Sequence, residues 1–151
     1  MATSVSSTGS DGDRTRFFRL CIILIDELTQ ILQDLLHNEI PPMQIYKKVV
    51  ERNFLDKLKP EQEVVVMNAK TRGYQDFDVT LLYTLLRNVC QNITPPSKYW
   101  GMSTMPSPNK VTVGDDIERI RLLRNKLFGH KSKVAISETE FKDQCSIIPG
   151  I

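Results

Sequence analysis

Residues Ile117–His130 read I-E-R-I-R-L-L-R-N-K-L-F-G-H, and this stretch is predicted to be the last long helix of the chain. At about 100° per residue, its apolar side chains share one arc of the helix. Arg124 lies on the same arc, seven positions after Ile117. A charge on a core-facing arc is costly unless it is paired or reaches a cleft, so we expect a functional site at this arginine. The apolar arc consists of Ile117, Ile120, Leu123, Leu127 and Phe128.

Helical periodicity also dominates the first third of the chain. Two apolar rows run side by side along residues 15–36 and cover more than half of the helix circumference, which predicts a central helix. Pro41 and Pro42 then interrupt the chain and open a second helix, since proline is tolerated in a first turn. Its apolar pattern continues, with a slight break at Asn53, as far as Leu58.

Shorter elements are predicted in the middle of the chain. Residues 61–68 are predicted to form a short helix, because Pro60 and the acidic residues after it are typical of a helix start. Residues 70–76 are predicted to be a turn or loop. Asp78 is predicted to cap a further helix over residues 79–92.

A long connection precedes the last helix. Residues 94–114 contain four prolines, and so long an irregular segment is uncommon in a small domain. We expect Tyr99 and Trp100 to pin it against the helices.

The fold class follows from these elements. With no convincing strand and no internal repeat, the sequence predicts an all-α fold, a single antiparallel helical bundle of four main helices plus short ones. The Ser-, Thr- and Gly-rich residues 1–13 are predicted to be a disordered tail, residues 14–146 the helical domain, and residues 147–151 a second tail.

Composition excludes several classes of protein. A net charge of +2 with 25% charged residues is ordinary for a soluble protein and gives no global argument for nucleic acid. Three scattered cysteines and two histidines do not suit a metal cage, so we expect no metal and no cofactor. The longest apolar run, Leu20–Ile25, is too short to span a bilayer, and no secretory signal is visible. We therefore expect a cytoplasmic protein without membrane contact.

Local charge gives a stronger signal than net charge. Six basic residues gather in the fifteen positions from Arg119 to Lys133, and no acidic residue lies among them. Such a cluster suits the phosphates of RNA, although composition alone also fits a solvated helix face. RNA is therefore the expected partner. The side chains expected to bind it are Arg119, Arg121, Lys126, Lys131 and Lys133.

Arg124 and Asn125 are followed closely by His130. Gly129 lets the chain leave helical geometry, so His130 can turn back over the same end of the helix. A histidine can act as general acid or base near neutral pH, while an arginine stabilises charge that grows on a phosphate. Because RNA carries its own 2′-OH nucleophile, such a pair could cleave it without a metal. A homodimer about a two-fold axis would bring two pairs into one cleft.

These residues also carry a family resemblance. The segment R-N-K-L-F-G-H, from Arg124 to His130, resembles the R-x4–6-H signature of HEPN domains. The similarity covers roughly residues 15–145, and the order of its segments is similar to the HEPN subfamily named after the DAZ-interacting zinc-finger ubiquitin ligase. The upstream segments that match are residues 77–82, 85–88, Pro95-Pro96, Trp100-Gly101 and 115–121.

The resemblance implies an antiparallel helical bundle that often dimerises, with the motifs facing each other. It implies either a metal-independent endoribonuclease or a member that binds RNA or another protein without cleaving. Carried over to this chain, His130 would be the catalytic acid or base, Arg124 the phosphate-stabilising group and Asn125 a polar supporting residue.

Three hypotheses remain open from the sequence. The first is an RNA-directed HEPN domain with endoribonuclease activity, and the second is a non-catalytic adaptor that binds RNA or a protein partner. The third is purely structural, with Arg124 paired to an internal acid and bracing the bundle.

Overall fold

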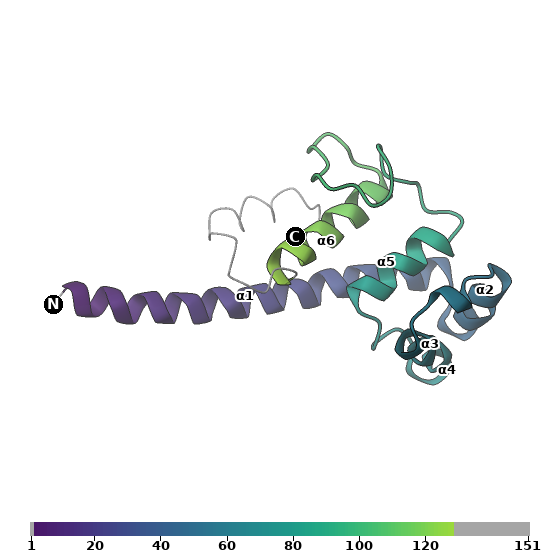
Figure 1. Ribbon diagram of the computed structural model, residues 1–151, viewed down its shortest axis with the longest axis horizontal. Coiled ribbons are helices and arrows are strands. Elements are labelled where there is room, and N and C mark those ends of the chain that lie inside the picture. The colour runs from purple at the N-terminus through teal and green to yellow at the C-terminus, as the bar shows by residue number, and fades with distance from the viewer. Residues whose placement is uncertain (1, 129–151) are drawn as a thin grey trace.

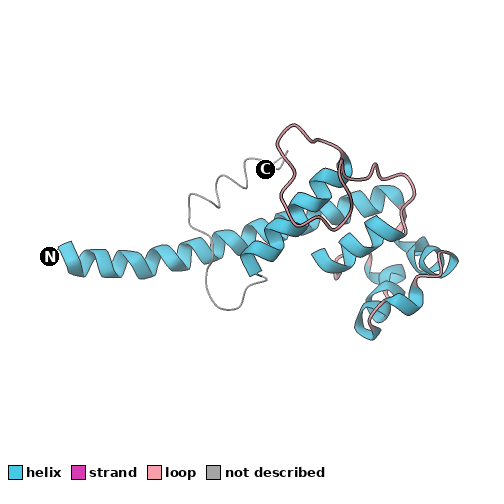
Figure 2. Ribbon diagram, turned by 45° about the horizontal axis from the view of Figure 1, so that its top comes forward, coloured by secondary structure: helices cyan, strands magenta, loops and turns pink. Residues whose placement is uncertain are grey.

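The fold is described from a computed structural model, which covers residues 2–128 and the side chains of residues 12–128. Every regular element in this part of the chain is a helix, which confirms the predicted all-α bundle (Figures 1 and 2). The elements are α1 (Ala2–Glu39), the 3-10 helix η1 (Pro42–Gln44), α2 (Ile45–Glu51), the 3-10 helix η2 (Leu55–Lys57), α3 (Pro60–Met67), α4 (Ala69–Arg72), α5 (Val79–Asn88) and α6 (Val113–Phe128).

Helix α1 is the spine of the molecule. The other helices gather along its C-terminal part, while its N-terminal part projects beyond them (Figure 1). Leu28, Leu32 and Leu36 on its core side are no more than 1% exposed. α5 and α6 both pack against this stripe, and α6 runs back toward the middle of α1 (Figure 1). The core therefore lies where these three helices meet.

The start of α1 differs from the prediction. The structure begins this helix at Ala2, whereas residues 1–13 were expected to be a disordered tail before a helix from about Thr15. Gly12 and Asp13 are exposed, so at these positions the helix adds nothing to the core. Extending a helix that already exists costs far less than starting one, because each added residue gains a backbone hydrogen bond.

The helix predicted to reach Leu58 is interrupted. α2 ends at Glu51, and Asn53 adopts a φ of 55°, in the left-handed region that few residue types visit. The chain then continues as η2. Thus the weak break in the apolar pattern at Asn53 marks the true end of the helix.

Two short helices follow. α3 confirms the short helix predicted after Pro60. α4 corrects the prediction for residues 70–76, because Ala69–Arg72 is helical rather than a loop. Ala69 is buried and anchors this turn, and Gly73 ends it with a φ of 65°.

α5 begins as predicted. The backbone N–H of Leu81 donates to the Asp78 carboxylate at 2.8 Å, which confirms Asp78 as the cap. The helix ends at Asn88, four positions earlier than expected. None of the helices in the described part of the chain is long and apolar enough to cross a membrane.

The connection from α5 to α6 is irregular, as predicted. The Trp100 ring packs edge-on against Tyr83 of α5, with ring centroids 5.9 Å apart, and so pins the loop. Tyr99 is 61% exposed and does not take part, contrary to expectation. At the end of the loop, the backbone N–H of Gly114 donates to the Thr94 carbonyl at 2.8 Å, which brings the two ends of the connection together.

Candidate functional site

α6 presents three arginines, and their surroundings differ. Arg119 was expected to contact RNA, but its side chain is only 1% exposed. Its guanidinium donates to the Asp116 carboxylate at 2.7 Å and to the Ser107 carbonyl at 2.7 Å, and it also donates to the Lys110 carbonyl. Arg119 therefore holds the long loop from inside, and the prediction that it binds RNA at the surface is wrong.

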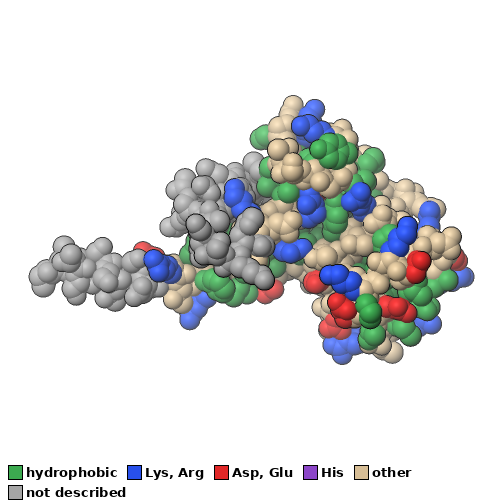
Figure 3. Space-filling view, viewed as in Figure 1, with side chains coloured by type: hydrophobic (Ala, Val, Ile, Leu, Met, Phe, Trp, Pro, Cys, Tyr) green, Lys and Arg blue, Asp and Glu red, His purple; other side chains and the backbone are tan. Residues whose placement is uncertain are grey.

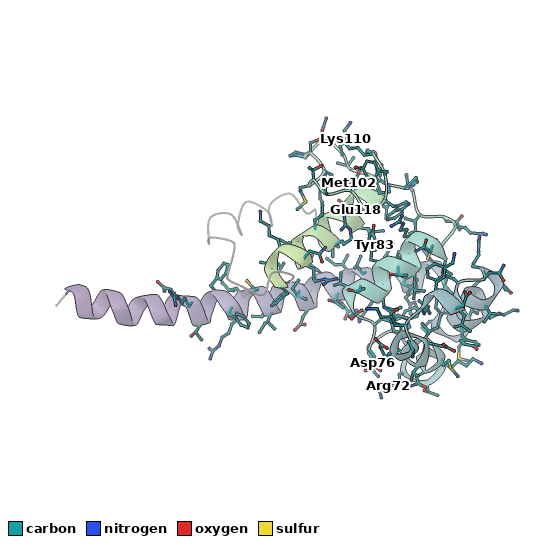
Figure 4. All side chains as sticks on the ribbon, in the orientation of Figure 1. Arg72, Asp76, Tyr83, Met102, Lys110 and Glu118 are labelled. Carbon is teal, nitrogen blue, oxygen red and sulfur yellow. The ribbon has the colours of Figure 1, made fainter. Side chains whose placement is uncertain are left out.

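Arg121 is also engaged internally. Its guanidinium pairs with the buried Glu118 carboxylate at 2.6 Å, donates to the Met102 carbonyl, and lies 5.3 Å from the centre of the Tyr83 ring. Glu118 in turn accepts from the Tyr83 hydroxyl at 2.5 Å and from the Gly101 N–H at 3.0 Å. Figure 4 shows Tyr83, Glu118 and Met102 in sequence from α5 through α6 to the loop. Arg121 thus braces the loop and is not a free RNA contact.

Both corrections have one physical cause. Each arginine has an acid three positions earlier on the helix, Asp116 for Arg119 and Glu118 for Arg121. Side chains at that spacing are neighbours on a helix surface. The pairing was therefore readable in the sequence, because the acid-free stretch begins directly after these two carboxylates.

Asp115 fixes the start of α6. Its carboxylate accepts four hydrogen bonds, from the N–H and hydroxyl of Ser97 and from the N–H and hydroxyl of Thr112. The Asp115 N–H donates back to the Thr112 hydroxyl at 3.0 Å, so the two residues cap the helix reciprocally. Burial alone would raise the pKa of this carboxyl group, but the hydrogen bonds lower the pKa to about 2.

This lowered pKa predicts a pH dependence of stability. Because the folded-state pKa lies below that of a free aspartate, ionised Asp115 stabilises the fold above about pH 4. The stabilisation is lost as the pH falls toward 2. Urea unfolding of the wild type should show this loss, whereas Asp115→Asn should be less stable at pH 6 and lose less below pH 4. Parallel stability curves for the two proteins would contradict this role.

Arg124 differs from the other two arginines. It is partly buried and has no carboxylate partner among the residues that the structure describes. One Nη donates to the Thr80 hydroxyl of α5 at 2.5 Å. Its Nε is enclosed and, like the Nε of Arg119, has no hydrogen-bond partner within residues 2–128. The hypothesis that an internal acid neutralises Arg124 therefore finds no support in this part of the chain.

The Arg124 guanidinium borders an open surface pocket of about 160 Å³. Its walls come from three helices, so residues far apart in the sequence meet here. Asp78 also lines this pocket, and its carboxylate accepts the capping hydrogen bond from the Leu81 N–H of α5. A pocket of this size suits an anionic group rather than a large ligand. The lining residues are Ile25, Thr29, Asp78, Val79, Thr80 and Arg124.

The remaining predicted site residues divide into two groups. Asn125 and Lys126 follow Arg124 in the last turns of α6 and are partly exposed. His130, Lys131 and Lys133 lie outside the described residues, as does the predicted tail 147–151. The structure therefore places Arg124, Asn125 and Lys126 at one end of α6, buries Arg119 and pairs the partly exposed Arg121 with Glu118.

The sequence did not reveal the partners of Arg124. Thr80 lies 44 positions before it, and no spacing rule connects the two. Thr29 of α1, which lines the same pocket, is even further from Arg124 in the sequence.

Comparison with known proteins decides the family. The model of a family described as DZIP3/hRUL138-like HEPN matches residues 26–149. The chain belongs to this HEPN family. The matched range includes every residue that lines the pocket except Ile25, all of α6 and the R-x5-H segment of this HEPN domain. No curated protein and no solved structure matches the chain.

Proposed function

We propose that this HEPN domain acts on RNA as a metal-independent endoribonuclease, with Arg124, Asn125 and His130 at its site. The observation that carries the proposal is the contrast within α6. Asp116 and Glu118 neutralise two arginines, whereas Arg124 borders a surface pocket and has no carboxylate partner among the described residues. A charge left in that position is best satisfied by an anionic ligand.

A phosphodiester fits the donors that the pocket offers. Arg124 borders the pocket, and Thr80 accepts from one of its two Nη groups, so the other Nη can donate to an entering oxygen. Arginine binds phosphate oxygens through two parallel N–H donors, with energies well above those of neutral hydrogen bonds. Thr80 would then hold the guanidinium in place while it binds the phosphate.

The chemistry needs a base, an acid and a stabilised phosphate. A base removes the proton of the RNA 2′-OH, the oxygen attacks the neighbouring phosphorus, and the bond to the 5′-oxygen of the next nucleotide breaks. An acid supplies a proton to that leaving oxygen, and a 2′,3′-cyclic phosphate remains. His130 is proposed for proton transfer, because its ordinary pKa lies near neutrality, and Arg124 for the charge on the phosphate.

A second copy of the chain completes this scheme. The base and the acid act on opposite sides of the phosphorus, and one R-x5-H segment supplies one histidine. Two copies related by a two-fold axis would provide both. We therefore propose a homodimer as the active form.

The proposal is tested with labelled single-stranded RNA in the presence of EDTA. Wild-type protein should cleave it, and Arg124→Ala should lower the rate by about 100-fold or more, since it removes the transition-state charge stabilisation. Arg72→Ala is the matched control, because it removes an exposed arginine of α4 that is already neutralised by Asp76. Equal rates for Arg124→Ala and wild type would contradict the site, and intact RNA with every protein would contradict the activity.

A non-catalytic binding module is the second candidate. It is favoured by apolar side chains on the flank of α1 away from the pocket, where Leu20, Ile23 and Ile31 are 38–57% exposed. Contiguous exposed apolar residues often mark a protein-binding surface. This alternative predicts that the protein binds a partner and that no RNA product forms under any condition.

A further inference from the structure

An exposed aromatic pair lies where α6 ends against α1. The rings of Phe18 and Phe128 meet edge to face, with centroids 6.3 Å apart and planes at 88°. Yet they remain 53% and 40% exposed, respectively. Phe128 was expected to face the core with the rest of the apolar arc. An edge-to-face contact between half-exposed rings leaves ring faces free for a further planar group.

The pair continues the Arg124 pocket. Phe128 follows Arg124 by four residues, so both lie on one face of α6, about 6 Å apart along its axis. Phe18 precedes Ile25 by seven residues and shares its face of α1, and Ile25 lines the pocket. Figure 1 shows the end of α6 lying against the middle of α1, and Figure 3 shows exposed hydrophobic side chains there.

We propose that Phe18 and Phe128 form a stacking subsite for one nucleobase of single-stranded RNA whose phosphate binds at Arg124. The subsite rests on the proposed function and specifies how the substrate is held. Proteins that bind single strands combine a cation for the backbone with aromatic rings on which bases stack. The separation of Arg124 and Phe128 is close to the length of one extended nucleotide, so one residue of RNA could reach both.

Charge favours RNA over an apolar protein segment as the occupant. A purely apolar helix laid over Phe18 and Phe128 would also cover Arg124 and leave its guanidinium without an anion. RNA satisfies both the Arg124 guanidinium and the two aromatic rings, because each nucleotide carries one phosphate anion and one flat base. The opposite flank of α1, with Leu20 and Ile23, does not line the Arg124 pocket and suits a protein better.

The test compares two ligands that differ only in their bases. One is a short 2′-O-methyl oligouridylate, which lacks the attacking hydroxyl and cannot be cleaved, and the other is its abasic counterpart. Phe18→Leu keeps an apolar side chain but removes the ring. It should weaken binding of the base-bearing ligand about fivefold or more and leave binding of the abasic ligand unchanged. Phe18→Trp should restore wild-type binding of the base-bearing ligand.

Two further variants separate this subsite from the proposed function. Arg124→Ala should weaken both ligands, because both contain the phosphate. Ile23→Ala removes an equally exposed apolar side chain from the other flank of α1 and should change neither. If Arg124→Ala weakens binding but Phe18→Leu affects both ligands equally or not at all, the stacking subsite is wrong and the function stands. If the wild type binds neither ligand, both are wrong.

Discussion

Replacing His130 by alanine should lower the rate of RNA cleavage by about 100- to 10,000-fold, the usual contribution of a positioned acid or base. The reason is that the proposed reaction transfers protons both from the 2′-OH and to the leaving oxygen. The Arg124 pocket should still bind the phosphate, so RNA affinity should change little. Initial rates in EDTA and binding of an uncleavable RNA, measured on the same preparations, would separate the two effects.

The second histidine of the chain provides the control. His37 lies near the C-terminal end of α1, where its ring packs edge-on against Tyr74, with centroids 6.2 Å apart. His37→Ala removes an imidazole of the same chemistry away from the pocket, and its cleavage rate should match the wild type. A rate for His130→Ala within twofold of the rate for His37→Ala would contradict the catalytic assignment.

Replacing Gly114 by alanine should cost about 3 kcal/mol of stability or more, or prevent folding. A Cβ at this position would lie 2.3 Å from the Pro96 nitrogen and 2.4 Å from the Pro95 carbonyl carbon. Both are backbone atoms, which cannot move aside as the end of a flexible side chain can. The clash would separate α6 from the loop that Arg119 and Arg121 hold. Urea unfolding of the purified variants measures the loss.

Gly12 is the matched position for this experiment. It also lies in a helix, but a Cβ there would meet nothing within 4 Å. Gly12→Ala should therefore stabilise the protein slightly, by about 0.5–1 kcal/mol, because alanine favours a helix over glycine. If Gly114→Ala were no less stable than the wild type, the close approach of α6 to the two prolines would be wrong.

Local pattern was sufficient to predict much of the fold. The two apolar rows of residues 15–36 identified the spine, and the carboxylate of Asp78 identified a cap that the structure confirms. These signals depend on neighbours within a turn or two, where helix geometry fixes which side chains meet. The end of α2 at Glu51, just before Asn53, and the short α4 were harder, since a single residue decides where a short helix stops.

Charge was harder to interpret than apolarity. The sequence predicted that Arg119 and Arg121 lie at the surface, because the sequence of one helix does not show which of its faces the rest of the chain covers. The loop of residues 94–112 folds over them and supplies carbonyl groups that the sequence pattern could not locate. Arg124 was recognised correctly as a charge that needs explaining, but its contact with Thr80 joins segments 44 residues apart. Such contacts depend on tertiary packing rather than on spacing.

We propose that this HEPN domain uses Arg124 and His130 to cleave RNA, with the 2′-OH of the RNA as the nucleophile. The 3′ ends of the products test it most directly. Wild-type protein, incubated with single-stranded RNA in EDTA, should give fragments that mass spectrometry identifies as 2′,3′-cyclic phosphates. RNA with a single 2′-deoxy nucleotide should resist cleavage at that position. Fragments with 3′-hydroxyl ends, cleavage at the deoxy position, or no cleavage at all would contradict the claim.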